Sequence, residues 1–127
     1  MLPLVSLLLV ACPGFGSQAI GGGNTEVPDA PTYIEHAGPI LDRYCAPCHG
    51  ETASGGAPDY FRLDAYENDG SRDGASEMAD RIEARATGDS PTMPPASATQ
   101  PTDIDREILA AWVADGAPYG ADTGGAE

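Results

Sequence analysis

The chain contains no lysine and few large apolar side chains. Leu, Ile, Val and Phe together supply 20 of the 127 residues, and seven of these 20 lie within the first ten positions. The rest of the chain therefore has 13 large apolar side chains and the whole net charge of -14. A chain with this balance is usually unable to build a core from its own side chains. The sequence indicates either a mostly unfolded protein or a core completed by a group that is not an amino acid.

The absence of lysine leaves six arginines against 20 acidic residues. A surface that binds along phosphate groups needs clustered positive charge, so this balance argues against a nucleic-acid-binding protein. Charge steering instead favours a partner with a basic docking surface. The length of 127 residues is that of one domain, and no internal repeat is visible.

An apolar run lies close to the N-terminus, at residues 7–11. It is far shorter than the ~20 residues that a membrane-spanning helix needs, so residues 1–11 are expected to be an export signal. Residues 9–12, Leu-Val-Ala-Cys, resemble the signal of bacterial lipoproteins, which implies that Cys12 is lipidated and becomes the mature N-terminus. The alternative is an ordinary secretory signal that is cut elsewhere. Both interpretations predict export, and the first predicts a lipid-anchored protein on the periplasmic side of a bacterial membrane.

Composition divides the remaining chain into three parts. Residues 12–30 are rich in glycine, proline and small polar residues without helical or strand periodicity, which predicts a flexible tether. Residues 31–120 contain the segments with apolar periodicity and are expected to form the domain. Residues 121–127 are expected to be a disordered tail.

Apart from Cys12, the chain has two cysteines, Cys45 and Cys48, and His49 follows directly. This Cys-x-x-Cys-His pattern is typical of covalent haem attachment. On a short helical turn, two thiols three residues apart can reach the two vinyl groups on one edge of a porphyrin, and the histidine can then bind the iron. We therefore expect one covalent haem c per chain, with His49 as an iron ligand. A haem would also supply the apolar bulk that the side chains lack.

Three other interpretations of these residues stay open at this point. A zinc site would need His36 beside Cys45, Cys48 and His49, although adjacent Cys48 and His49 are poorly placed in one tetrahedron. A thioredoxin-like redox pair would need a preceding strand, which the sequence does not indicate. A structural disulfide is sterically possible in an exported protein but gives His49 no role.

Helical periodicity is present in three segments of the expected domain. A possible capping box at residues 32–35 precedes a helix at 39–45, and a weaker helix is expected at 76–85. The clearest helix has Thr102 as its N-cap and Asp105 at the third position, and Gly116 ends it. Trp112 on its apolar face is expected to be a core residue. Between the first two helices, residues 60–66 are expected to pack on one face of the haem.

The loop before the last predicted helix contains Met93 followed by two prolines. The prolines hold Met93 away from the helical region and stiffen the loop, so the thioether can be presented at a small ordering cost. Met93 is therefore the expected sixth ligand of the iron, and an ordinary flexible core side chain is the alternative. Its rivals are water, Met78, which falls inside a predicted helix, and His36, nine residues before Cys45.

These segments together resemble a class I c-type cytochrome with one haem, and more narrowly the short cytochrome c domains first described in planctomycete proteins. The matching pieces occur in the order of that family: Pro39-Ile40-Leu41, Cys45-Ala46-Pro47-Cys48-His49-Gly50, Leu63-Asp64, Met93-Pro94-Pro95 and Ala111-Trp112-Val113-Ala114-Asp115-Gly116-Ala117-Pro118. The resemblance covers about residues 33–118. It implies an all-α fold, a small cytochrome c fold of three to four short helices around one covalent haem. The stretch at 57–76 is longer and more acidic than the family pattern.

The resemblance implies one-electron transfer between redox protein partners, with the iron cycling between ferric and ferrous states. No nucleophile with its base and no paired-carboxylate site is visible, so enzyme activity is not expected. One alternative is a haem-binding subunit or gas sensor with an open sixth position, and another is a lipid-anchored interaction module with a disulfide. Arg62, Arg81 and Arg85 are candidates to pair with the haem carboxylates or are plain surface charges.

Overall fold

The computed structural model describes residues 24–120, and every regular element in that range is helical. In chain order these elements are the π-helical turn η1 (Tyr33–Ala37) and the α-helices α1 (Gly38–Tyr44), α2 (Ala46–His49), α3 (Ala79–Ala86) and α4 (Asp103–Ala114). The β pairing found between residues 24 and 120 consists of two isolated bridges. None of these helices is long and apolar enough to cross a membrane. The predicted all-α class is confirmed.

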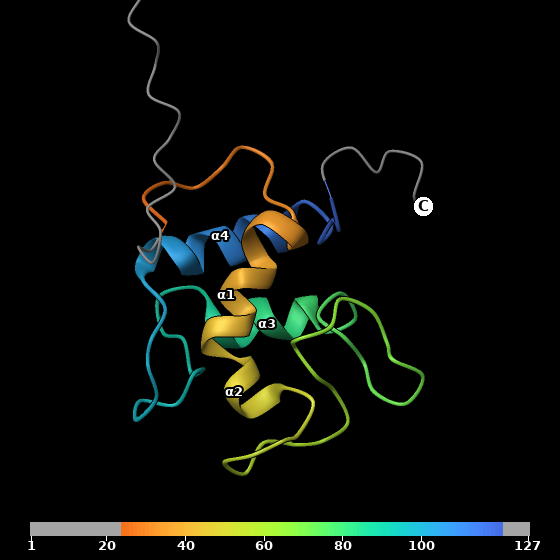
Figure 1. The fold of residues 1–127 in the computed structure, drawn as a ribbon. Helices are drawn as coiled ribbons and strands as arrows, with labels where there is room; N and C mark the ends of the chain where they lie inside the picture. Colours follow the sequence, from red (N-terminus) through yellow and green to blue (C-terminus); the bar gives the residue numbers. More distant parts are fainter. Residues whose placement is uncertain (1–23, 121–127) are drawn as a thin grey trace, which may run out of the picture.

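Figure 1 shows η1, α1 and α2 stacked in one column, with α4 and α3 behind it. Helix α4 lies nearer the η1 end of the column and packs against both η1 and α3. The first predicted helix, at 39–45, corresponds to α1. The second begins three residues later than predicted, at Ala79, because residues 75–78 form turns, and the Glu77 carboxylate accepts a hydrogen bond from the Gly74 N–H at 2.8 Å.

Helix α4 begins with the capping interaction that the sequence predicts. Thr102 Oγ1 accepts a hydrogen bond from the Asp105 N–H at 3.0 Å, and the Asp105 carboxylate accepts one from the Thr102 N–H at 3.1 Å. The reciprocal pair satisfies two backbone donors that a helix start would otherwise leave unpaired. Asp105 is buried, so its carboxylate also fixes the position of α4 in the domain.

Residues 24–30, which composition assigns to the tether, contact the folded domain. The Asn24 side-chain amide donates a hydrogen bond to the Asp105 carboxylate at 2.8 Å, and Val27 packs against the core. Contacts with the domain therefore begin before residue 31, because a buried carboxylate and an apolar surface are both available there. Residues 1–23, including Cys12, and residues 121–127 lie outside the described part of the chain.

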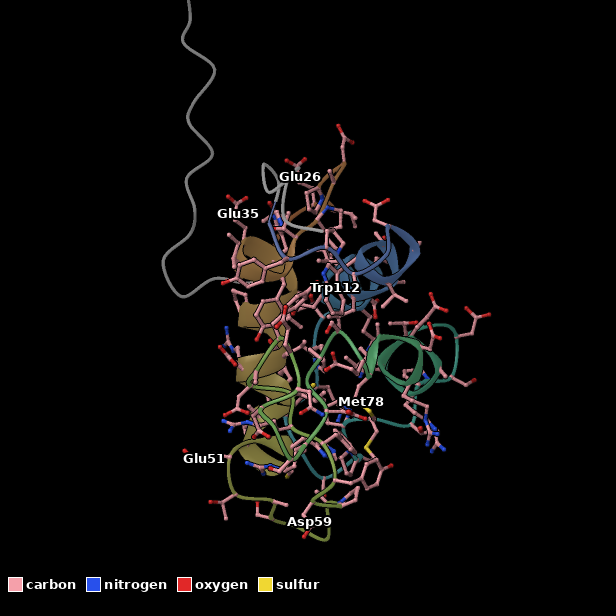
Figure 2. The ribbon with its side chains drawn as sticks, turned by 90° about the vertical axis from the view of Figure 1, so that its right-hand side faces the viewer. Glu26, Glu35, Glu51, Asp59, Met78 and Trp112 are labelled. Atoms are coloured by element: carbon pink, nitrogen blue, oxygen red, sulfur yellow. The ribbon has the colours of Figure 1, made fainter. Side chains whose placement is uncertain are left out.

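The core is filled where η1, α1 and α4 meet. Its largest fully enclosed side chains include Trp112, Leu41, Ile108 and Leu109. Figure 2 shows Trp112 between the α1 column and α4, and its indole N–H donates a hydrogen bond to the Pro118 carbonyl at 3.0 Å. Trp112 is thus a core residue, as predicted, and its one polar atom is paired.

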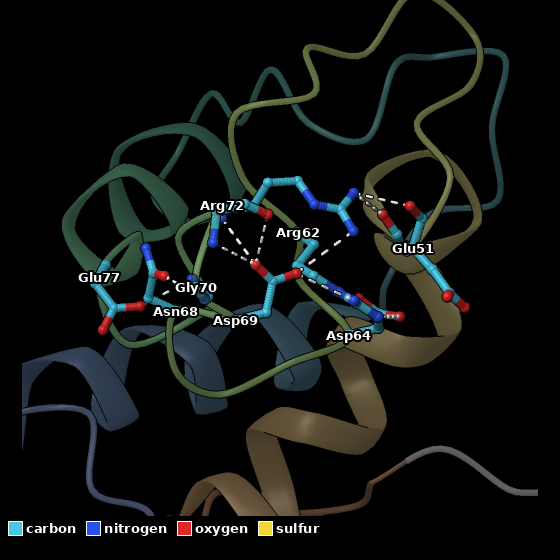
Figure 3. A network of polar contacts seen from close by, with 11 residues as sticks. Glu51, Arg62, Asp64, Asn68, Asp69, Gly70, Arg72 and Glu77 are labelled. Carbon is cyan, nitrogen blue, oxygen red and sulfur yellow. Dashed lines mark hydrogen bonds and ion pairs between the residues drawn. The ribbon is translucent and has the colours of Figure 1, made fainter.

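The long segment between α2 and α3 is held by arginine–carboxylate contacts (Figure 3). Arg62 donates two hydrogen bonds of 2.6 Å to Asp64 and one of 3.3 Å to Asp69. Asp69 in turn accepts from the Arg72 N–H at 2.8 Å, and the Arg72 guanidinium reaches the Glu51 carbonyl at 2.8 Å. The acidic stretch is therefore folded back toward α2 by two arginines.

Candidate functional site

A cavity of about 380 Å³ lies at the α2 end of the domain, and Trp112 is not part of its wall. The wall is made by the end of α1, by α2, by the segments at 55–63 and 93–99, and by α3. Its side chains with ligand chemistry are Cys45, Cys48, His49, Met78 and Met93. The volume is typical of sites for small molecules and cofactors. Cys45 and Met93, which are 48 positions apart in the sequence, thus line the same cavity.

The two cysteines are free and share one helical turn at the cavity wall. The N–H groups of Cys48 and His49 both donate to the Cys45 carbonyl, at 3.1 and 2.8 Å. Burial raises the pKa of the Cys45 thiol to about 11, so this thiol is protonated near neutral pH. Redox-active and zinc-binding cysteines depend on the thiolate and on surroundings that lower the pKa. The surroundings of Cys45 therefore do not resemble those of a thioredoxin-like pair.

The His49 ring has binding capacity that the described protein atoms do not use. Its Nδ1 is buried and has no hydrogen-bond partner in the described part of the chain. The ring stacks on Phe61 with 4.9 Å between centroids and 20° between planes. Burial lowers the pKa of the imidazole, which favours the neutral form with a lone pair available to a metal ion. The ring as a whole lines the cavity, whereas Nδ1 itself is enclosed by protein atoms.

Close backbone contacts hold His49 in place. The Leu63 N–H donates to the His49 carbonyl at 2.6 Å. At Gly50 a Cβ atom would lie 2.5 Å from the Ala46 carbonyl oxygen, so only glycine allows the chain to turn back here. Phe61 and Leu63 are consequently buried against α2 and line the cavity, in the segment that the sequence assigns to one haem face.

Two methionines line the cavity, and their surroundings differ. Met78 is the residue before α3, not a residue within that helix, and its side chain is 7% exposed as part of the core cluster. Met93 is in the loop before α4 and is 36% exposed. The Met93 thioether is less constrained by core packing, so it is better able to turn toward a group in the cavity.

His36, the other rival ligand, does not line the cavity. Its Nδ1 accepts a hydrogen bond from the Thr32 N–H at 3.0 Å, which gives this histidine a role in ordering η1. Between residues 24 and 120, no group of three or more His, Cys, Asp or Glu side chains is arranged to hold a metal ion. The zinc interpretation therefore lacks its ligand set in this structure.

Three of the six arginines line the cavity: Arg43, Arg81 and Arg85. Their side chains form no ion pair within the described residues, whereas Arg62 is bound to carboxylates and lies outside the cavity wall. Arg43 is missing from the candidates chosen by sequence, although its place two residues before Cys45 on α1 is a usable signal. An apolar hollow with cationic side chains at its wall suits a mostly apolar group that has anionic substituents.

Comparison with known proteins finds no family model, no curated protein and no solved structure that matches this chain. The function must therefore be inferred from the residues at the cavity. These offer two thiols, a neutral imidazole, two thioethers and three guanidinium groups.

Proposed function

We propose that the protein is a one-electron carrier with one covalently attached haem c in the cavity, like the small class I c-type cytochromes that its sequence resembles. The observation that supports this most is the lining of one cavity by Cys45, Cys48, His49 and Met93. These are the thiols, the imidazole and the thioether that the sequence pattern predicts as haem attachments and iron ligands.

The residues at the cavity fit a haem in three respects. Cys45 and Cys48, on one turn, would form the two thioether links. His49, whose ring lines the same cavity, would bind the iron. The cationic side chains at the wall, such as Arg81, would pair with the two haem carboxylates. When bound, the haem supplies one-electron redox chemistry at its iron.

The protein itself would exclude water from the cavity and would supply the two ligands of the iron. The buried rings and aliphatic groups of Phe61, Leu63 and Ile82 line the cavity, so they would keep solvent from the iron. A low-dielectric wall disfavours the more highly charged ferric state, and a soft Met93 thioether favours ferrous iron. Both effects raise the reduction potential relative to an exposed haem with two imidazole ligands.

One observation favours a second candidate function. The Met93 side chain is 36% exposed in a loop, so it could be displaced by a small gas. A haem with an open or displaceable sixth position would serve a sensor or an enzyme subunit instead of a simple carrier.

A redox titration combined with carbon monoxide binding separates the two functions. The exported protein, matured in a host that attaches haem c, should titrate reversibly with one electron and remain low-spin in both oxidation states. The ferrous protein should bind carbon monoxide slowly, whereas the control Met93→Ala should be high-spin and bind it rapidly. Equal rates for the two proteins would show an open sixth position and would replace the carrier with the sensor or subunit.

The cellular location is also part of this proposal. Lipidation at Cys12 would hold the domain on the periplasmic side of a membrane, where a redox partner with a basic surface would dock on the acidic chain. Wild-type protein should fractionate with membranes, and Cys12→Ser should be soluble with the same haem content. Freely soluble wild-type protein with an N-terminus beyond residue 12 would refute the anchor.

A further inference from the structure

The loop between α3 and α4 presents Met93 at the cavity without any helix of its own. Its four prolines, at 91, 94, 95 and 101, have no N–H to donate, so regular backbone pairing is unavailable there. The N–H groups of Thr92 and Met93 both donate to the Arg85 carbonyl at 2.8 Å, which fixes one side of the loop to the end of α3. The carbonyl groups on the other side must find donors elsewhere.

Those donors come from one arginine on α4. Arg106 Nη1 donates to the Met93 carbonyl at 2.9 Å and to the Ala86 carbonyl at 2.7 Å. Arg106 Nη2 donates to Gln100 Oε1 at 2.7 Å. A single guanidinium group therefore connects the last residue of α3, the backbone of Met93 and the side chain of Gln100.

Gln100 extends the same network along the loop. Its Nε2 lies 3.2 Å from the Pro94 carbonyl, 2.8 Å from the Pro95 carbonyl and 3.1 Å from the Ala98 carbonyl. The Met93 carbonyl before Pro94 and the Pro95 carbonyl thus each accept a hydrogen bond, from Arg106 and Gln100 respectively. This network would hold the loop in one conformation, although neither Arg106 nor Gln100 lines the cavity.

Within residues 24–120, the Arg106 side chain forms no ion pair with a carboxylate, although the chain contains 20 acidic residues. Its hydrogen bonds go to two backbone carbonyl oxygens and one amide oxygen, all neutral, so its planar set of donors holds these three groups in a fixed arrangement. Arg106 follows the capping box of α4, which is fixed to the filled core. The guanidinium thus connects the Met93 loop to the helix that carries the buried side chains Ile108, Leu109 and Trp112.

We propose that Arg106 is a positioning residue for Met93, which keeps the thioether at the cavity by holding the backbone of its loop. The inference rests on the proposed function, because it assigns the position of an iron ligand. Lysine at residue 106 would retain the positive charge but could not form the same fork of hydrogen bonds. The substitution Arg106→Lys therefore separates positioning from a purely electrostatic effect on the iron.

The experiment compares mature wild-type protein with Arg106→Lys, Gln100→Leu and the matched control Arg62→Lys. The readouts are the near-infrared sulfur-to-iron band of the ferric protein, the midpoint potential and the rate of carbon monoxide binding. Arg106→Lys should weaken the band, lower the potential and bind carbon monoxide on the order of tenfold faster. Gln100→Leu should shift all three in the same direction but less, and Arg62→Lys should match wild type.

A folded Arg106→Lys with the wild-type band, potential and binding rate would overturn the inference while leaving the proposed function intact. If Arg106→Lys fails to fold, Gln100→Leu decides the question by the same readouts, and wild-type values in that variant would overturn the inference. Absence of the band from wild-type protein would overturn Met93 ligation and this inference together.

Discussion

The two ends of the domain's core are built differently. Around Trp112 the core is solid, because the large side chains of η1, α1 and α4 enclose one another. At the α2 end, the end of α1, α2, α3 and two loop segments surround a cavity of about 380 Å³, and the side chains at its wall include thiols, an imidazole and thioethers. The 13 large apolar residues beyond position 10 are too few to fill both ends. The missing apolar volume is therefore concentrated where the proposed haem would lie.

The largest expected effect is on folding, when no haem occupies the cavity at the α2 end. A chain with Cys45→Ala and Cys48→Ala cannot attach haem covalently, so the apolar wall of the cavity would face water and the folded state would lose the burial that the haem supplies. We expect circular dichroism to show little helix and no cooperative thermal transition. The control Cys12→Ser should fold like wild type. Equal helix content and melting temperature in the double variant and wild type would contradict the comparison.

The next effect concerns the filled end. Trp112→Ala removes a fully enclosed ring and should lower the free energy of unfolding of the haem-loaded protein by about 3–5 kcal/mol. Trp112→Phe keeps an apolar ring but loses the hydrogen bond to Pro118, so it should cost less. Denaturant titration measures both, and the visible spectrum before unfolding should not change. A spectral shift in Trp112→Phe would mean that the two ends are not separable.

Substitution of the two methionines at the cavity wall tests which thioether binds the iron. Met93→Leu should abolish the near-infrared band and lower the potential, because the soft ligand is lost. Met78→Leu conserves volume within the core, so it should keep the band and cost less than about 1.5 kcal/mol of stability. The opposite result, with the band lost only in Met78→Leu, would make Met78 the ligand.

A smaller effect is expected at the start of α4. Thr102→Ala removes the cap that accepts from the Asp105 N–H and should cost about 1 kcal/mol of unfolding free energy. Thr102→Ser keeps the hydroxyl and should cost a few tenths at most. Urea titration of both variants checks the difference, and equal stability of the two would show that the cap contributes nothing. The potential should be unchanged in either variant.

The smallest effect is the pH dependence contributed by Asp64. Hydrogen bonds from Arg62 hold the pKa of the Asp64 carboxyl below its usual range. The stabilisation is therefore complete above the unfolded-state pKa of about 4 and is lost as the pH falls through the lower folded-state pKa. The melting temperature of Asp64→Asn should therefore fall less between pH 6 and pH 3 than the melting temperature of wild type. An identical fall in both proteins would show that Asp64 does not contribute.

Much of the filled end can be predicted from the sequence because its signals are local. The pair Thr102 and Asp105 forms the predicted cap, and Trp112 occupies the predicted core position on the same helix. The turn from Cys45 to His49 is equally local, so the motif alone indicates that its side chains share one surface. Short-range sequence spacing is sufficient to predict a contact when both side chains lie on one helical turn.

The contacts of the Met93 loop could not be predicted in the same way. Arg106 reaches the Met93 carbonyl 13 positions away, and Asn24 reaches Asp105 across 81 positions. Such side-chain bonds depend on how helices pack, and no periodicity or spacing in the sequence encodes them. For the same reason, sequence spacing does not show that His36 lies outside the cavity wall.

Intact mass under denaturing conditions tests the central claim most directly. Protein exported with its signal in a host that matures c-type cytochromes should have the mass of the mature polypeptide, including any lipid, plus one haem. The haem should stay with the polypeptide on a denaturing gel and resist extraction by acid acetone, because two thioether bonds at Cys45 and Cys48 hold it. A polypeptide mass without haem, or colour that is extracted by acid acetone, would contradict the account.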